Sequence, residues 1–588
     1  MGTKQDKWVI IFLIYADFIK SDTPESPQFD TAYAKELDKL LERLYKTKFD
    51  KSNIKIYIIY GSLNYKKTSD DSEAQKLHSD VHIFQLQSKI YGNNMVHLKI
   101  IENGEIPERS ENDLGTFSLQ RKKSLKKTFN YIKGLNKGDN KVKYILNTWD
   151  HGSVFGIFKS EIHIRVVRGF PEITKEEYPN LFFLIKKIPR LNANIPPLDK
   201  SVVVFEKDNF LNKINLGNII SIDKFKELIH NKILVFETND SGEMIKLNHP
   251  NLLKKFDSEE EFINWLEILE YFPISADKTS FLNAMLSFNI QPAGILEILT
   301  NEELSGAIEE SFGKIELISM MNCWMMNLHS LYAFRNCVEY LIAPQGGISE
   351  PGYDYKSIIE LINKPKINTN KIIKKYISSS YNFKNKERKN KKTEINSWAI
   401  MAATVFKNKD IINDSLVKEI ESIAQILVEE LESKTNTKEE EREILRKLSF
   451  VHFMAKISYN FSYGERYFQL DLLNWLQTLD GFNPVQEDFP ILKNFEKEHV
   501  VRVQKLSSQL FLRNARYLNH VYDFQVENNT GSPFRGVTIY KPNGLSIYLP
   551  FVNNKNSIAD KLYIIKSATE KLADRIPTWT KLINKLSL

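Results

Sequence analysis

Two short segments of the sequence place a reactive side chain directly after a run of apolar residues. Residues 144–152 read YILNTWDHG and end in His151 and Gly152, and residues 315–325 read IELISMMNCWM and contain Cys323. Open α/β sheets place their ligands at the carboxyl ends of parallel strands. An imidazole beside a thiol lowers its pKa towards the reactive thiolate, and the unobstructed N–H of a glycine can receive an oxyanion. The pattern therefore favours His151 as a general base and Cys323 as a nucleophile, if the two strands are neighbours.

Both residues also have a structural interpretation. A histidine at a strand end is more often structural than catalytic, and a buried cysteine commonly packs as a small hydrophobic residue. Finding the two groups at the ends of two strands of one sheet favours the catalytic interpretation. His329, six residues after Cys323 on the predicted following helix, is an alternative base, but it lies more than one helical turn away.

The apolar runs of the N-terminal third alternate with amphipathic stretches, as in an α/β sheet covered by helices. Strands are expected at 8–15, 54–60 and 144–149, helices at 31–45 and 122–137, and a hairpin at 81–86 and 96–101. The alternation returns later, with a helix at 302–310, a strand at 315–320, a helix at 324–338 and a strand at 340–343. These elements predict an α/β fold with a mostly parallel sheet flanked by helices.

The remainder of the chain differs in character, being irregular and proline-rich after His151 and helical and rich in lysine and asparagine from residue 356. We expect a catalytic α/β domain at 1–158 and 274–355, an inserted subdomain at 159–273, a helical region at 356–480, and a small C-terminal α+β portion at 481–588. Within these parts we expect an aromatic helix at 262–271, a solvated loop at 383–393, helices at 416–433 and 439–459, and strands at 536–540 and 545–549.

The composition argues against several classes of protein. A formal net charge of +7 is small for 588 residues, so nucleic-acid binding through the Lys-rich helical region is only a weak alternative. Two cysteines, Cys323 and Cys337, cannot build a disulfide framework or a Cys-rich zinc site, which fits a reducing, intracellular setting. The apolar run at 8–15 is followed by Asp17 and Lys20 rather than by a cleavage site, so we expect a soluble, cytoplasmic protein without a signal peptide.

Five segments carry a family resemblance: the strand at 8–15 with Asp17, WDHG at 149–152, MNCWM at 321–325, the strand at 340–343 with EPG at 350–352, and GLSIYLP at 544–550. Together they resemble the clostripain family of cysteine peptidases, which are relatives of caspases and gingipains. The resemblance covers nearly the whole chain except residues 159–273. Its histidine and cysteine segments are the specific parts, and the others support them.

This resemblance implies a caspase-like fold and a cysteine endopeptidase that acts by acyl transfer to a thiolate. His151 would take the thiol proton, Cys323 would attack the scissile carbonyl, and the N–H groups of Gly152 and Cys323 would hold the oxyanion. Family members manage with a His–Cys dyad, and no organic cofactor is implied. Some relatives need calcium, but the sequence has no Asp/Asn-rich loop of the EF-hand kind, so we assign no metal ligand.

The sequence departs from the family pattern two positions before the cysteine. The family has an acidic residue there, thought to line the pocket for an Arg or Lys side chain, whereas this chain has Met321. A desolvated arginine needs a carboxylate partner. We expect Met321, Asn322 and Glu350 to contact the substrate, with two alternatives: Glu350 supplies the missing carboxylate, or the pocket prefers an apolar or a different polar side chain.

The long insertion between the two catalytic segments predicts regulation. Family members and caspases are often cut in this interval, and Lys186-Lys187 and Lys254-Lys255 are candidate cut sites. We expect a regulated intracellular protease whose partners are a protein substrate and a regulatory partner or activating protease acting on 159–273. The alternative is a catalytically inactive caspase-like scaffold, which loss of the acidic residue favours and retention of both catalytic side chains opposes.

Overall fold

The structure of the chain is a computed structural model. It describes residues 7–16, 19–20, 28–29, 31–61, 64–65, 77–78, 81–88, 94–101, 119, 121–138, 142–161, 163–167, 174–187, 202–206, 236–238, 244–246, 296–346, 348, 352–389, 400–433, 469–481, 497–512, 544–549 and 571–586.

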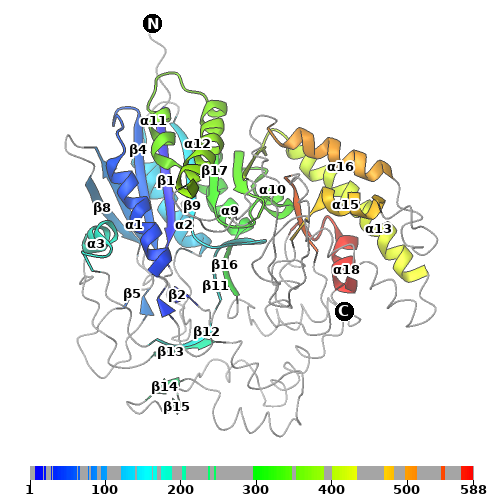
Figure 1. Cartoon of the computed structure of the whole chain (residues 1–588), viewed down its shortest axis with the longest axis horizontal. Helices are drawn as coiled ribbons and strands as arrows, with labels where there is room; N and C mark the ends of the chain where they lie inside the picture. The colour runs from blue at the N-terminus through cyan, green and yellow to red at the C-terminus, as the bar shows by residue number, and fades with distance from the viewer. Residues whose placement is uncertain are drawn as a thin grey trace.

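An eight-stranded sheet forms the centre of the molecule, with strand order β19-β18-β17-β9-β1-β4-β7-β8 (Figure 1). The strands from β18 to β4 are parallel, and β19, β7 and β8 are antiparallel to their neighbours. The central strand β1 is buried on both faces, which explains its continuous apolar run. The predicted α/β fold with a mostly parallel sheet is confirmed. The strands are β1 Lys7–Tyr15, β4 Ile54–Gly61, β7 Val81–Gln87, β8 Asn94–Ile101, β9 Val142–Trp149, β17 Ile315–Met321, β18 Val338–Pro344 and β19 Ile400–Thr404.

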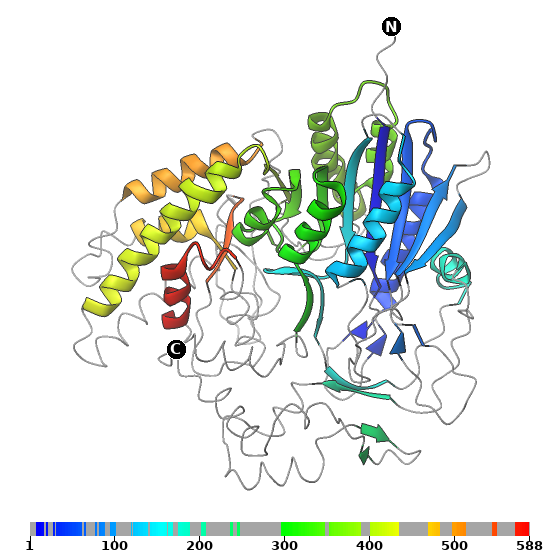
Figure 2. The ribbon, with the colours of Figure 1, turned by 180° about the vertical axis from the view of Figure 1, so that it is seen from behind.

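Helices cover both faces of this sheet (Figures 1 and 2). Alternate residues of β1 enter different apolar clusters, Val9 and Ile11 on one face and Ile10 and Phe12 on the other, because successive side chains of a strand point to opposite sides. The first face is covered by α2 Lys122–Gly134, α9 Asn301–Phe312 and α10 Leu328–Phe334. The second is covered by α1 Thr31–Lys46, α3 Pro179–Lys186, α11 Tyr355–Ile362 and α12 Thr369–Lys389.

A second group of helices lies beside α10, on the side of the sheet away from β7 and β8 (Figure 1). Its apolar side chains, including Trp475 and Trp579, belong to the same cluster as the first face of the sheet. The described C-terminal elements therefore share the apolar core of the first face of the sheet instead of forming one of their own. Its elements are the π-helical turn η5 Ile411–Leu416, α13 Val417–Ser433, α15 Leu472–Gly481, α16 Lys497–Leu510, α18 Pro577–Leu586, and the paired strands β20 Gln469–Asp471 and β21 Ser546–Tyr548.

The interval between residues 161 and 296, which contains most of the insertion predicted at 159–273, begins and ends at adjacent strands. Strand β11 (Gly156–Glu161) pairs with β10 (Gly152–Ser153) and β16 (Leu296–Thr300), so Glu161 lies opposite Leu296. Between them, β12 His163–Val167, β13 Val202–Glu206, β14 Phe236–Thr238 and β15 Met244–Lys246 form a four-stranded sheet. Two short hairpins, β2 Ile19–Lys20 with β3 Gln28–Phe29 and β5 Asn64–Tyr65 with β6 Leu77–His78, complete the strands of the described residues.

Helix α3 lies within the predicted insertion but packs on the domain of the central sheet. The Asp38 carboxylate of α1 accepts the backbone N–H groups of Asn180 and Leu181 at 2.7 and 2.8 Å, and so caps the N-terminus of α3 from another helix. Leu181 and Leu184 are fully buried in the second-face cluster. Part of the interval 159–273 is thereby fixed to the sheet domain.

Two predicted elements differ in the structure. The helix expected at 324–338 is only α10, because Trp324 has a φ of 70° and the Asn327 side chain caps the helix by accepting the Ser330 N–H at 2.8 Å. The loop expected at 383–393 is wrong up to Lys389, where α12 ends, since its lysine, glutamate and arginine residues are good helix formers. The elements expected at 262–271, 439–459 and 536–540 lie outside the described residues.

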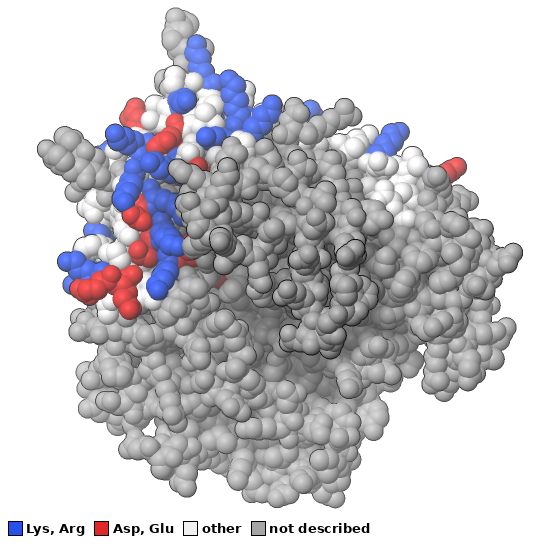
Figure 3. Space-filling model, viewed as in Figure 1, with Lys and Arg blue, Asp and Glu red and all other residues white. Residues whose placement is uncertain are grey.

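Charged side chains of both signs are interleaved on the described surface shown in Figure 3, over α1 and its neighbours. Lys39 and Glu36 of α1, for example, form an ion pair of 2.5 Å. Among the helices that the structure describes, none combines the length and the apolar character needed to cross a membrane.

A buried histidine pair on the outer hairpin predicts a pH-dependent stability. His82 is 1% exposed, and its ring centroid lies 5.7 Å from that of His97. Burial, and to a lesser extent repulsion from His97, lowers the pKa of His82 to about 3. The unfolded chain, with an ordinary pKa of about 6.5, binds this proton first, so stability is complete above that pH and is lost as the pH falls towards 3.

We expect the free energy of unfolding to lose about 1.4 kcal/mol from this group for each pH unit below about 6.5. Thermal unfolding of the wild type and of His82→Leu at about pH 7 and about pH 5 measures this loss, because leucine cannot take up the proton. The melting temperature of the variant should fall less between the two pH values. Equal falls would contradict the prediction.

Candidate active site

The histidine segment leaves the sheet at the end of β9. Asp150 has a φ of 154°, an unusual value for a residue other than glycine, and His151 is exposed. The His151 carbonyl accepts the Phe158 N–H at 3.0 Å, which turns the chain into the β10–β11 hairpin. The imidazole is therefore held at the carboxyl end of a central parallel strand, where it can reach solvent.

Tyr33 of α1 supports this segment from the second face of the sheet. Its ring stacks on Trp149 with centroids 4.5 Å apart and on His151 with centroids 5.3 Å apart, the latter within 8° of parallel. Its hydroxyl donates a hydrogen bond to the Asp150 carboxylate. Sequence reasoning missed Tyr33, because an aromatic residue near the start of a helix has no spacing that relates it to a histidine more than a hundred residues later.

The cysteine segment leaves the neighbouring strand at the same level. The parallel pairing of β17 with β9 ends at Met321 opposite Trp149, so the next residues of both strands emerge side by side. After Cys323 the chain turns sharply, with Trp324 at a φ of 70°. The Trp324 N–H donates to the Gly346 carbonyl at 2.8 Å, and this bond fixes the turn to the end of β18. The structure thus brings the two predicted catalytic segments together.

At Gly152 the two segments are in close contact. A Cβ at this position would lie 2.8 Å from the Cys323 amide nitrogen and would meet the Cys323 carbonyl oxygen still closer. Only glycine allows this approach, because backbone atoms cannot give way as a flexible side chain can. The backbone N–H groups of Gly152 and Cys323 lie in this junction, where sequence analysis expected an oxyanion site.

The Cys323 thiol is half-buried and lies against the backbone of Ile348, beyond β18. The Ile348 N–H donates to Sγ at 3.3 Å, and Sγ lies 3.8 Å from the Ile348 carbonyl oxygen. An N–H that donates to sulfur stabilises the thiolate, whereas a carbonyl acceptor suits the protonated thiol. The contact can therefore serve the thiol in either protonation state.

The other cysteine has a different environment. Cys337 is 1% exposed, and burial, followed by the charge of Glu309, raises the pKa of its thiol well above the ordinary value. Its Sγ lies 3.8 Å from the Phe334 carbonyl oxygen in the first-face cluster. Cys337 is thus a protonated core residue, and Cys323 is the cysteine placed for chemistry.

Among the residues predicted to contact substrate, Met321 packs beneath Gly352. It is 9% exposed, and a Cβ on Gly352, whose φ is 69°, would meet the Met321 sulfur. Met321 shares the second-face cluster with Trp149 and Tyr353, so the surroundings of this position are apolar. Glu350 lies outside the described residues.

Asn322 is fully buried, at 0% exposure. Its Nδ2 group donates to the carbonyl oxygens of Asp150 at 2.8 Å and His151 at 3.2 Å, and its Oδ1 atom accepts a hydrogen bond from the Thr148 hydroxyl. The side chain is directed into the junction between the two catalytic segments. Sequence reasoning did not find this arrangement, because it depends on which strands are neighbours.

The alternative base, His329, lies in the core. It is 4% exposed, and its ring meets Phe155 edge to face with centroids 4.9 Å apart. Helix α10 begins only at Leu328, so the chain between Cys323 and His329 is mostly turn rather than helix. His151 is the histidine that emerges beside the cysteine segment.

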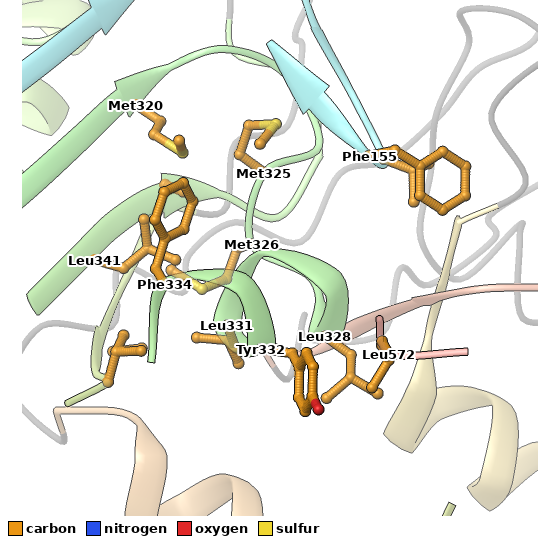
Figure 4. Packing of buried hydrophobic residues seen from close by; sticks show 14 of the residues in the cluster. Phe155, Met320, Met325, Met326, Leu328, Leu331, Tyr332, Phe334, Leu341 and Leu572 are labelled. Carbon is orange, nitrogen blue, oxygen red and sulfur yellow. The ribbon is translucent and has the colours of Figure 1, made fainter. Parts of the chain in front are cut away.

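The turn that follows Cys323 packs against a cluster of methionine, aromatic and aliphatic side chains. Met320, Met325 and Met326 lie with Phe334 and Leu341 in this cluster (Figure 4). Methionine fills irregular spaces well because it is unbranched and polarizable. The residues that follow Cys323 are thus anchored in a densely packed apolar cluster.

Strands from the far end of the chain complete the support. The Ser546 N–H of β21 donates to the Met326 carbonyl at 3.3 Å. Gln345, at the end of β18, donates to the buried Asp471 carboxylate at 3.0 Å and accepts the Gly544 N–H at 2.9 Å. Residues near 345, 471 and 546 therefore help to fix the turn, a role that the sequence did not predict.

The part of the chain that the structure describes holds no candidate metal site. Among the described residues, no three His, Cys, Asp or Glu side chains converge in a way that could hold a metal ion.

The sheet, with a thiol and an imidazole leaving adjacent parallel strands, has the layout of an α/β cysteine hydrolase. Residues 294–566 match the model of the Clostripain family, Peptidase_C11, and this region contains Cys323. The match over these residues confirms the predicted resemblance to this family, and it supports a cysteine peptidase. His151 lies outside the matched residues, and the roles of the individual site residues stay predictions.

The chain is also similar to solved structures of this group. One is an inactive zymogen C11 protease from Parabacteroides distasonis, with 11% identity, a TM-score of 0.43, and coverage of 98% of this chain and 99% of that chain. Another is a secreted C11 cysteine protease from Bacteroides thetaiotaomicron in complex with an irreversible peptide inhibitor, with 10% identity, a TM-score of 0.42, and coverage of 96% and 98%. No curated protein matches the chain.

Proposed function

We propose that the chain is a cysteine endopeptidase in which His151 and Cys323 form the catalytic dyad. His151 accepts the thiol proton, and the Cys323 thiolate attacks the scissile carbonyl to form a tetrahedral oxyanion at the N–H groups of Gly152 and Cys323. The oxyanion collapses, the leaving amine takes the proton from His151, and water then hydrolyses the thioester. The observation that best supports this dyad is the contact of the Gly152 backbone with Cys323 at the ends of adjacent strands.

We expect cleavage after residues other than arginine and lysine, because Met321 places an apolar side chain where a carboxylate would be needed to pair a desolvated cation. The experiment is digestion of a diverse peptide library by the purified chain, with the cleaved bonds identified by mass spectrometry. A clear Arg or Lys preference would contradict this expectation and would favour Glu350 as the source of the carboxylate.

The second part of the proposal concerns regulation through the insertion. We propose that the enzyme is cytoplasmic and stays latent until a regulatory partner or a protease acts on residues 159–273. Lys186 and Lys187 lie at the end of α3, where Lys187 Nζ donates to Asn94 at 3.1 Å. Lys254-Lys255 lies outside the described residues. A fragment that forms in the wild type but not in Cys323→Ala would support self-processing, and equal formation in both would rule it out.

A non-catalytic scaffold is the second candidate, and the burial of Met321 in an apolar cluster is the observation that favours it. The two candidates differ in one result. If neither the intact chain nor the chain nicked between residues 159 and 273 cleaves any library peptide, the scaffold is the better assignment.

A further inference from the structure

We propose that Asn322 is a positioning residue that aligns the dyad, by joining the strand that carries Cys323 to the strand that carries His151. The inference rests on the proposed function, and it concerns a side chain that touches neither the reacting thiol nor the imidazole in the hydrogen bonds described above. It assigns to Asn322 a role other than the substrate contact expected from the sequence.

The need for such a residue follows from the sheet. The backbone pairing of β17 with β9 ends at Met321 and Trp149, and both catalytic residues lie two positions farther along. Past the last paired residues, no ladder hydrogen bond of these two strands sets the distance between the segments. The Asn322 side chain lies at this point and bonds across the gap to the carbonyl oxygens of Asp150 and His151.

The chemistry of the site requires an amide. Its two N–H donors meet two carbonyl oxygens, and its single oxygen accepts from the Thr148 hydroxyl, so each group of the fully buried side chain has a partner of the right kind. The Thr148 bond also fixes which way the amide faces. An aspartate of the same shape would direct a carboxylate oxygen at the two carbonyls and would repel them.

The Asn322 side chain also holds the Asp150–Gly152 backbone, which carries the Gly152 N–H expected to bind the oxyanion. Asp150, with its φ of 154°, is fixed through its carbonyl by Asn322 and through its carboxylate by Tyr33. Such a conformation persists only when its surroundings determine it. Loosening the Asn322 side would let the Asp150–Gly152 segment move away from Cys323.

The test uses the full chain with Asn322→Asp and Thr148→Val, and with Thr148→Ser as the conservative variant that keeps the hydroxyl. Alkylation of Cys323 by iodoacetamide is followed by peptide mass spectrometry from about pH 5 to about pH 9. We expect Asn322→Asp to slow alkylation near neutral pH by about 100-fold and to move the midpoint towards that of a free thiol, with kcat reduced and KM little changed. Thr148→Val should shift the pH profile of alkylation less, in the same direction. Thr148→Ser, which keeps the hydroxyl, should have the profile of the wild type.

The outcomes separate the inference from the proposed function. A wild-type Cys323 that titrates as an ordinary thiol would overturn the dyad and the inference with it. A wild-type profile with a low midpoint that neither Asn322→Asp nor Thr148→Val changes, even though their melting temperatures fall, would overturn only the inference, leaving Asn322 a structural residue. If Asn322→Asp does not fold, comparison of Thr148→Val with Thr148→Ser tests the inference in the same way.

Discussion

Replacing Cys323 with alanine is expected to reduce the rate of peptide cleavage by about 10⁴-fold or more, because the residual site retains its oxyanion donors but has no nucleophile. The measurement compares kcat/KM of the two proteins on a peptide that the library identifies. Cys323 is half-buried at the end of a strand, so the smaller side chain should leave the fold intact.

Cys337→Ala is the matched control. This thiol is buried, and its pKa is raised by burial, so its removal should cost about 1 kcal/mol of stability and leave the cleavage rate unchanged. Cleavage that survives Cys323→Ala, or that disappears with Cys337→Ala at an unchanged melting temperature, would place the nucleophile elsewhere.

Gly152→Ala should lower kcat/KM by about 10²- to 10³-fold, the usual cost of losing one oxyanion donor. The added methyl group would meet the Cys323 carbonyl oxygen and lie 2.8 Å from its amide nitrogen, so the two segments must separate. We expect the separation to withdraw the Gly152 N–H from the reacting carbonyl. Kinetics on the same peptide and the melting temperature should be measured together.

Gly134→Ala provides the control for this change. Gly134 is the last residue of α2, and a Cβ there meets nothing within 4 Å. The alanine should leave cleavage unchanged and, if anything, stabilise the helix by up to about 1 kcal/mol. A Gly152→Ala enzyme as active as Gly134→Ala would show that the junction of Gly152 with Cys323 has no part in the reaction.

The sequence predicts the strands of the sheet well, because their continuous apolar runs are the direct result of burial on both faces. The end of β9 before His151 and the end of β17 before Cys323 were visible for this reason. The shortened α10 was not predictable, since the left-handed turn at Trp324 is held by the hydrogen bond to Gly346, which follows the neighbouring strand β18.

The supporting contacts of the site were missed for a related reason, although Asn322 itself was expected to contact the substrate. Tyr33, Thr148 and Asn322 act through side-chain contacts between segments far apart in the chain, and no local periodicity marks such contacts. The pairing of β11 with β16, which flank the insertion, could not be predicted either, because it also joins segments far apart in the chain. Local patterns predict elements, whereas these residues depend on how the elements are arranged.

The contact of β21 with the cysteine turn has a consequence for synthesis on the ribosome. Ser546 bonds to Met326 only after residue 546 has been translated, whereas the strands that precede His151 and Cys323 emerge much earlier. We expect the nascent chain to carry an incompletely packed turn at Cys323 until residue 546 has left the ribosome. Such timing would protect the ribosome and its chaperones from a proteolytic enzyme while it is being made.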